Sequence, residues 1–130
     1  MKAATIVFFF ASTLLTSAVA EEVPGISIAE MESMIESKEA IILDVNGSKY
    51  FAKGHLPGAI DFRANEGDLP AVLGDDKEQL IVVYCGSPSC EAYLAAAAAA
   101  QQLGYTNVKH LPAGISGWIA AGKPTDISKE

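Results

Sequence analysis

The stretch LIVVYCGSPSCEAYLAAAAAAQQLGY, from Leu80 to Tyr105, decides the fold. It begins with a short apolar run rich in β-branched residues, which is typical of a strand buried on both faces of a parallel sheet. A Gly/Ser/Pro loop follows, and then a run of alanine, the best helix-forming residue. We therefore expect a strand over residues 80–84 and a helix from about Ser89 to Leu103 that ends at Gly104.

The segments on both sides of this stretch alternate between strand and helix patterns. Short apolar runs predict three further strands, at residues 40–45, 59–62 and 107–111. Ser27 and Glu30 have the spacing of a capping box, which predicts the start of a helix. The segment ISGWIAAG, residues 115–122, predicts a last helix. This alternation predicts an α/β domain around a mainly parallel sheet.

The first 20 residues, MKAATIVFFFASTLLTSAVA, have the pattern of a secretory signal peptide. Lys2 precedes an apolar stretch, and small residues precede Glu21. The apolar stretch is shorter than the roughly 20 residues of a membrane-spanning helix, so an uncleaved anchor is the weaker alternative. We expect cleavage after Ala20, export to the periplasm or the extracellular medium, and a single domain over residues 21–130.

The chain is acidic. Its 9 Lys and Arg residues and 16 Asp and Glu residues give a formal net charge of −7 at pH 7. The acidic residues are scattered along the chain and form no separate tail. This charge gives no electrostatic basis for binding nucleic acid or an anionic membrane. We expect neither as a partner once the signal peptide is cleaved.

The two cysteines, Cys85 and Cys90, enclose the Gly/Ser/Pro loop and have several possible roles. A cysteine after a buried strand is often only a small hydrophobe. An oxidising compartment would permit a disulfide between the two. A structural zinc site is not expected, because His55 and His110 do not complete the spacing of such a site. We predict no metal and no cofactor.

A further role for Cys85 is that of a nucleophile. It directly follows the carboxyl end of a predicted central strand, where ligands of parallel sheets bind. The loop leads into a helix N-terminus, whose N–H groups lack intrahelical partners and whose dipole is positive. A compact turn can aim such groups at one anion. This position predicts a lowered pKa for Cys85 and a reactive thiolate near neutral pH.

Two segments resemble the rhodanese family. IILDVNGSKYFAKGHLPGAIDF, residues 41–62, resembles its signature of a strand ending in Asp-Val followed by Gly-His-[Ile/Leu]-Pro-Gly-Ala. Residues 80–124 resemble its second half, with a cysteine loop, an Ala-rich helix, Leu-Gly-Tyr, Gly-Trp and Gly-x-Pro. The matches run in family order from about Ile26 to Pro124. The resemblance implies a central, mainly parallel five-stranded sheet with helices on both faces.

The resemblance also implies sulfur transfer. The loop cysteine of the family, matched by Cys85, attacks the sulfane sulfur of a donor such as thiosulfate, a polysulfide or a persulfide. It carries this sulfur as a persulfide until a thiol or another thiophilic acceptor takes it. Asp44 and His55 match supporting positions, and we favour a structural role for both. The backbone amides of the loop surround the persulfide in the family, and here belong to Gly86, Ser87, Pro88, Ser89, Cys90 and Glu91.

The chain departs from the family pattern around the cysteine. Asn46 stands where members often have Arg, and the loop contains neither Arg nor Lys. Glu91 repels an incoming anion, and Pro88 has no N–H group to donate. We therefore expect thiosulfate to be a poorer donor than a polysulfide or a protein persulfide. Arg63 is a candidate for attracting anions, but the sequence does not place it.

Cys90 leaves alternatives open. It is either a resolving thiol, which attacks the Cys85 persulfide and releases sulfide, or a small residue of the first helical turn. The protein as a whole has three possible functions: a sulfurtransferase, a non-catalytic binding or sensing module, or a thiol–disulfide redox protein that uses both cysteines. Trp118 and Tyr105 match packing positions and are expected in the core.

Overall fold

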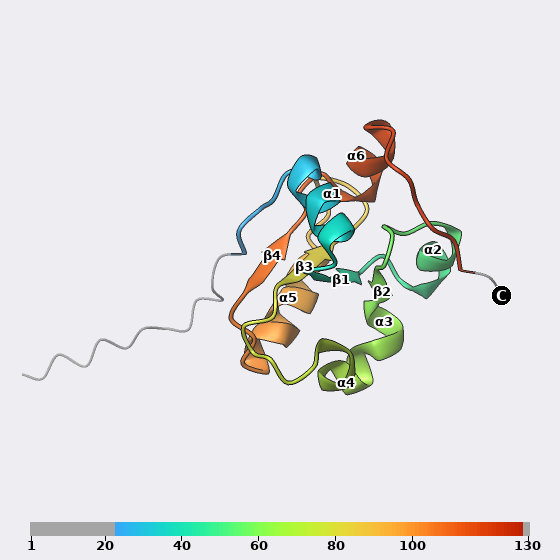
Figure 1. The fold of residues 1–130 in the computed structure, drawn as a ribbon. Coiled ribbons are helices and arrows are strands. Elements are labelled where there is room, and N and C mark those ends of the chain that lie inside the picture. Colours follow the sequence, from blue (N-terminus) through green and yellow to red (C-terminus); the bar gives the residue numbers. More distant parts are fainter. Residues whose placement is uncertain (1–22, 129–130) are drawn as a thin grey trace, which may run out of the picture.

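The computed structural model describes residues 23–128, so the predicted signal peptide lies outside the described residues. In this part the chain forms a parallel sheet with the strand order β2-β1-β3-β4, covered by helices on both faces (Figure 1). The strands are β1 Ile41–Asp44, β2 Ile60–Asp61, β3 Ile81–Tyr84 and β4 Val108–His110. Between residues 23 and 128, no helix has the length and apolar character needed to cross a membrane.

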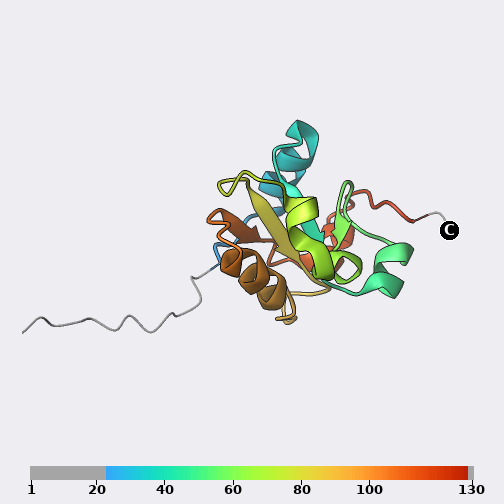
Figure 2. The same ribbon diagram turned by 90° about the horizontal axis from the view of Figure 1, so that it is seen from below.

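The helices form two layers around the sheet (Figures 1 and 2). On one face lie α1 Ile28–Ser37 and α6 Gly114–Ala120, and on the other lie α3 Phe62–Asn65, α4 Leu69–Leu73 and α5 Tyr93–Gln102. The helix α2 Ser48–Lys53 lies beyond the β2 edge, and the 3-10 turn η1 Glu66–Asp68 joins α3 to α4.

Alternation along the central strands builds one core on each face. Leu43 of β1 and Val83 of β3 pack on the side of α4 and α5. Ile42 and Val82 point the other way, toward Trp118 and the helix α1. Every residue of β3 is buried, as the continuous apolar run predicts. Burial of each such side chain contributes about 1.5–3 kcal/mol, so β3 is the centre of the fold.

The prediction of a fifth strand was wrong. Within residues 23–128, the pairing beyond β4 is limited to a single parallel bridge, between Gly25 and His110. In this bridge Ile26 N donates to His110 O and His110 N donates to Pro24 O, each at 2.9 Å. Pro24 has no N–H group and cannot extend a ladder, so the pairing stops after one bridge.

The helix α1 begins as predicted. Ser27 Oγ accepts from Glu30 N at 3.1 Å, and Glu30 Oε1 accepts from Ser27 N at 3.2 Å. These two bonds form the capping box that the spacing predicts.

The predicted start of the helix after the cysteine loop was wrong. The helix α5 begins at Tyr93, not at Ser89, and ends at Gln102. The segment before it turns back on itself, with Cys90 N donating to Ser87 O at 3.1 Å. This turn makes the loop longer than its Gly/Ser/Pro composition indicates, and Cys90 therefore lies in the loop and not on the helix.

Candidate active site

The residue Cys85 lies where the sequence predicts, directly after the carboxyl end of the central strand β3. The strands are parallel, so the chain leaves β1 at the same edge of the sheet, through Asp44 and Asn46. Cys85 is buried, with 3% of its surface exposed, whereas Ser89 and Glu91 of the following loop are exposed. The Cys85 thiol is therefore buried, whereas the loop that follows it is largely exposed.

The start of α6 holds the beginning of the cysteine loop. Ile115 N donates to Cys85 O and Ser116 N donates to Gly86 O, both at 2.9 Å. The close approach of α6 to the cysteine loop depends on Gly114, which has φ +63°. A Cβ atom at this position would lie 2.8 Å from both Cys85 O and Ser87 N. Free amides at a helix N-terminus thus bind two loop carbonyls. The sequence analysis did not predict this contact, and Gly114, which begins α6, was the signal in the sequence that could have indicated it.

The thiol of Cys85 is a hydrogen-bond donor in this conformation. Its Sγ donates to the carbonyl oxygen of Cys90 at 3.2 Å. Burial, supported by the side chain of Cys90, raises the pKa of Cys85 to about 11, against the lowering effect of the Tyr93 and Gly86 amides. The predicted lowering of this pKa was therefore wrong. The helix N-terminus starts too late in the chain, and a carbonyl takes the place of further amides.

The thiol of Cys90 has the opposite environment. The hydrogen bond from the Cys85 side chain lowers the pKa of Cys90, and the amides of Ala92 and Gly86 lower it further. Cys90 is also more exposed than Cys85, and both thiols are free. The structure thus brings the two cysteines together and makes Cys90 the more acidic one.

The remaining loop residues form the turn over Cys85. The hydroxyl groups of Ser87 and Ser89 lie 3.2 Å apart. Pro88 and Ser89 are exposed to solvent. Within the predicted loop of residues 86–91, the amide of Gly86 is the one that lowers the pKa of Cys85. The anion cradle of loop amides therefore stays a prediction.

The buried carboxyl group of Asp44 ties three segments together. Its Oδ1 accepts from Asn46 N at 2.8 Å, and its Oδ2 accepts from the Tyr84 hydroxyl at 2.5 Å. The same hydroxyl accepts from Leu56 N at 3.0 Å. Burial raises the pKa of Asp44 above its ordinary value. Asp44 therefore positions the ends of β1 and β3 and the turn at Leu56, in keeping with a supporting role.

The contacts of His55 support its structural role. Its Nδ1 lies 2.8 Å from Phe51 O, and its ring stacks on that of Phe51 with centroids 3.9 Å apart. Its backbone pairs with Asp126 through two bonds of 2.9 Å. These contacts bind the end of α2 to the C-terminal segment. Trp118 and Tyr105 lie in the core, as predicted.

Two cavities flank Asn46 at the mouth of the site. One of about 250 Å³ is lined by Arg63 and Ala92 as well as Asn46, and the other, of about 390 Å³, by Lys53 and Gly86. Asn46 Oδ1 lies 3.2 Å from the position of a Cβ atom on Gly86. Cationic side chains therefore reach the approaches to the site from outside the loop, a placement that the sequence did not reveal.

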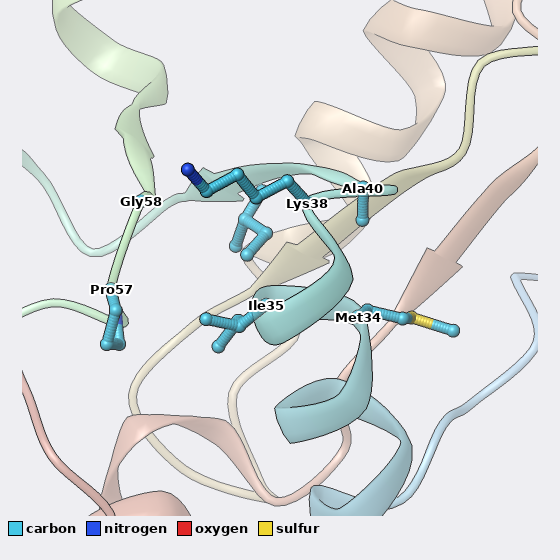
Figure 3. A pocket seen from close by; sticks show the side chains of 7 residues that line it. Met34, Ile35, Lys38, Ala40, Pro57 and Gly58 are labelled. Carbon is cyan, nitrogen blue, oxygen red and sulfur yellow. The ribbon is translucent and has the colours of Figure 1, made fainter.

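A third cavity lies away from the cysteines. It has a volume of about 320 Å³ and lies between α1 and the turn at Pro57 and Gly58 (Figure 3). Ala40 and Gly58 precede β1 and β2, so this cavity is at the edge where the strands begin. No three His, Cys, Asp or Glu side chains within residues 23–128 gather in a way that suits a metal ion.

Comparisons with known proteins agree with this architecture. The chain is 33% identical over 93 residues to a tRNA uridine(34) hydroxylase of Erwinia tasmaniensis, a match that covers 67% of this chain but only 26% of the hydroxylase. It is 29% identical over 101 residues to the thiosulfate sulfurtransferase GlpE of Shewanella oneidensis, covering 74% of this chain and 92% of GlpE. This chain thus spans nearly all of one relative and about a quarter of the other.

Solved structures show the same fold. The human single-domain sulfurtransferase TSTD1 superposes with a TM-score of 0.63 at 26% identity, covering 76% of this chain and 97% of TSTD1. The BH2092 protein of Bacillus halodurans gives a TM-score of 0.65 at 28% identity, covering 80% and 77% of the two chains. The family model of the rhodanese-like domain matches residues 27–121. The chain therefore belongs to the rhodanese-like domain family.

Proposed function

We propose that this protein is a sulfurtransferase in which Cys85 accepts a sulfane sulfur and passes it to a thiol. The observation that carries the proposal is the position of Cys85, at the carboxyl end of the central strand with its backbone held by the start of α6. The family of the chain supports it, since GlpE and TSTD1 are named as sulfurtransferases. The sulfur donor and the acceptor of this chain are part of the proposal.

The chemistry is a pair of displacements at sulfur. The Cys85 thiolate attacks the sulfane sulfur of the donor, the S–S bond of the donor breaks, and the rest of the donor leaves with the electron pair. An acceptor thiolate then attacks the outer sulfur of the persulfide and returns Cys85 as a thiolate. The amides of Gly86 and Tyr93, which favour the ionised form of Cys85, stabilise the charge on this sulfur.

The attack on the donor requires the loop to move. With a pKa of about 11, only about one Cys85 thiol in ten thousand is ionised at pH 7. An outward movement of residues 88–91, of which all but Cys90 are exposed, would expose the sulfur to solvent and withdraw the Cys90 carbonyl. The bonds from Ile115 and Ser116 would still hold the backbone of Cys85 and Gly86. The same movement of the loop would therefore admit the donor and favour ionisation of the Cys85 thiol.

The cysteine loop offers thiosulfate, a dianion, little electrostatic attraction. Glu91 is exposed on the loop, Glu66 lines the same cavity as Arg63, and Lys53 lines a separate cavity. We therefore propose a polysulfide or a protein persulfide as the donor in preference to thiosulfate. We also propose that this activity lies in the periplasm or outside the cell, without nucleic acid or membrane as a partner, because residues 1–20 have the pattern of a signal peptide.

The test is to load the purified protein and to measure transfer to cyanide. Incubation with polysulfide should add one sulfur atom to Cys85, seen by intact-mass and peptide mass spectrometry, and cyanide should release it as thiocyanate. Cys85→Ser should take up no sulfur and release no thiocyanate. Transfer that survives this substitution would remove Cys85 from the mechanism.

A second candidate function is a non-catalytic binding or sensing module. The observation that favours it is the raised pKa of the buried Cys85 thiol. The same loading experiment separates the two functions, because a non-catalytic module takes up no sulfur from polysulfide, persulfide or thiosulfate.

A further inference from the structure

We propose that Cys90 discharges the Cys85 persulfide inside the protein, which releases hydrosulfide and leaves a Cys85–Cys90 disulfide. The protein would then act as a sulfide-releasing persulfide reductase that a thiol reductant resets. This inference rests on the proposed function, because it starts from sulfur bound to Cys85. It assigns that sulfur a fate other than transfer to an external acceptor.

The contacts between the two cysteines carry the inference. Cys85 Sγ lies 3.2 Å from the carbonyl oxygen of Cys90, to which it donates a hydrogen bond. Both thiols are free in this conformation. The turn in which Cys90 N donates to Ser87 O at 3.1 Å returns the chain toward Cys85. A second thiol thus already occupies the surroundings of the first.

The environment of Cys90 suits an attacking thiol. It is more exposed than Cys85, and the amides of Ala92 and Gly86 favour its ionised form. The backbone of Cys85 is held at its carbonyl by Ile115 N at 2.9 Å, so the attacked sulfur stays in place. Thiol–disulfide exchange needs a partly ionised attacking thiol with access to the attacked sulfur. The lowered pKa of Cys90 and its greater exposure favour this reaction.

The position of Cys90 also gives it an advantage over external thiols. Cys85 is 3% exposed, so an acceptor from solution must wait for the loop to open. Cys90 moves with that loop and approaches Cys85 whenever the loop closes. An intramolecular reaction between groups held together is faster than the same reaction between free molecules. We expect discharge by Cys90 to compete with transfer when the outside thiol is scarce.

The step balances in atoms and electrons. The Cys90 thiolate attacks the inner sulfur of the persulfide, which is the original Cys85 Sγ, and a new S–S bond forms between the two residues. The bond to the outer sulfur breaks, and this sulfur leaves as hydrosulfide with the electron pair. The sulfane sulfur is reduced and the pair of cysteines is oxidised. A small-molecule or protein dithiol then reduces the disulfide by two exchange steps and restores both thiols.

The experiment loads the reduced wild-type protein with inorganic polysulfide, removes the excess by gel filtration, and follows sulfide and protein mass without reductant. We expect about one sulfide per Cys85 loaded, together with a peptide in which Cys85 and Cys90 are joined. Cys90→Ser and Cys90→Ala should instead keep the added sulfur on Cys85, with sulfide release slower by at least about tenfold. Peptide mass spectrometry should find the retained sulfur on Cys85 in both variants.

The outcomes separate this inference from the proposed function. A wild-type protein that keeps a stable persulfide, or that releases sulfide no faster than Cys90→Ser, would overturn the inference and leave the sulfurtransferase intact. A failure to load any sulfur on Cys85 in the wild type and in both Cys90 variants would overturn both. Added sulfur found on Cys90 would show attack at the outer sulfur and would also contradict the proposed discharge.

Discussion

Among the individual side chains, the two thiols differ most in what surrounds them. Cys85 is buried and donates to the carbonyl of Cys90, whereas the Cys90 thiol is partly exposed and its pKa is lowered by the Cys85 side chain and by nearby amides. The spacing of the cysteines in the sequence shows only that they enclose a loop. Their opposite pKa shifts follow from the direction in which that loop turns, and while the loop is closed they make Cys90 the thiol that a small alkylating reagent meets as a thiolate.

The first prediction concerns the order of alkylation. Iodoacetamide reacts with thiolates, so at pH 7 it should modify Cys90 before Cys85. The rate at Cys85 should rise about tenfold per pH unit up to its pKa of about 11. Peptide mass spectrometry over time measures both rates. Faster modification of Cys85 than of Cys90 at pH 7 would contradict the acid order derived from the structure.

The second prediction concerns Asn46, which lies against Gly86 at the mouth of the site. Asn46→Arg should place a cation beside both flanking cavities and lower the KM for thiosulfate. A partly exposed charge interaction of about 1 kcal/mol corresponds to about fivefold. Asn46→Gln, which lengthens the side chain without adding charge, is the control. Equal KM values for the two variants, from steady-state assays, would show that charge at this position does not limit thiosulfate binding.

At the next level of organisation, one short helix determines the shape of the cysteine loop. The N-terminal amides of α6 bind the carbonyls of Cys85 and Gly86. The contact brings together the ends of two elements that lie about thirty positions apart in the chain. Further along the loop, Pro88, Ser89 and Glu91 are exposed. The same loop can therefore keep its nucleophile in place while its outer part opens.

The third prediction tests this contact. Gly114→Ala adds a Cβ atom 2.8 Å from two backbone atoms of the loop, at a φ of +63°. We expect a loss of about 1–3 kcal/mol in the free energy of unfolding, measured by urea denaturation, and slower loading of sulfur on Cys85. Gly67→Ala is the matched control, because its added Cβ atom meets nothing within 4 Å. Similar stability of the two variants would argue against the contact.

Across the molecule as a whole, a buried polar network connects the sheet to the turn that precedes β2. Asp44 on β1 and Tyr84 on β3 are 40 residues apart in sequence, and their hydrogen bond lies among fully buried side chains. Tyr84 also accepts from Leu56, in the turn of the family signature. Buried polar groups are costly unless they are satisfied, so this network specifies how the strands and the turn fit together.

The fourth prediction follows from the raised pKa of Asp44. Folded protein holds the Asp44 proton more tightly than unfolded protein, whose pKa is the ordinary 3.8. The resulting stabilisation is complete below pH 3.8 and is lost as the pH rises through the raised pKa. Asp44→Asn has no such titration. The wild-type free energy of unfolding, relative to that of the variant, should therefore fall between pH 4 and pH 7 in urea denaturation. A constant difference would contradict the shift.

The local pattern of the chain was sufficient for most of the architecture. The apolar run before Cys85 predicted a buried central strand, and Ser27 with Glu30 predicted the start of α1. The family signature indicated which cysteine to consider as the nucleophile. These features depend on residues close together in sequence, whose periodicity and turn chemistry act locally. The fifth strand and the early start of α5 were wrong because Pro24 and the turn at Ser87 override the pattern.

By itself, the sequence determined the alternation of strands and helices, the two-sided burial of β3 and the place of Cys85 at its carboxyl end. Only the tertiary structure decided that Cys85 is the less acidic thiol, that Gly114 lets α6 contact the loop, and that Arg63 and Lys53 line two different cavities beside Asn46. The physical reason is the range of the interactions. Burial and hydrogen bonding at the site come from segments that meet only when the sheet has formed.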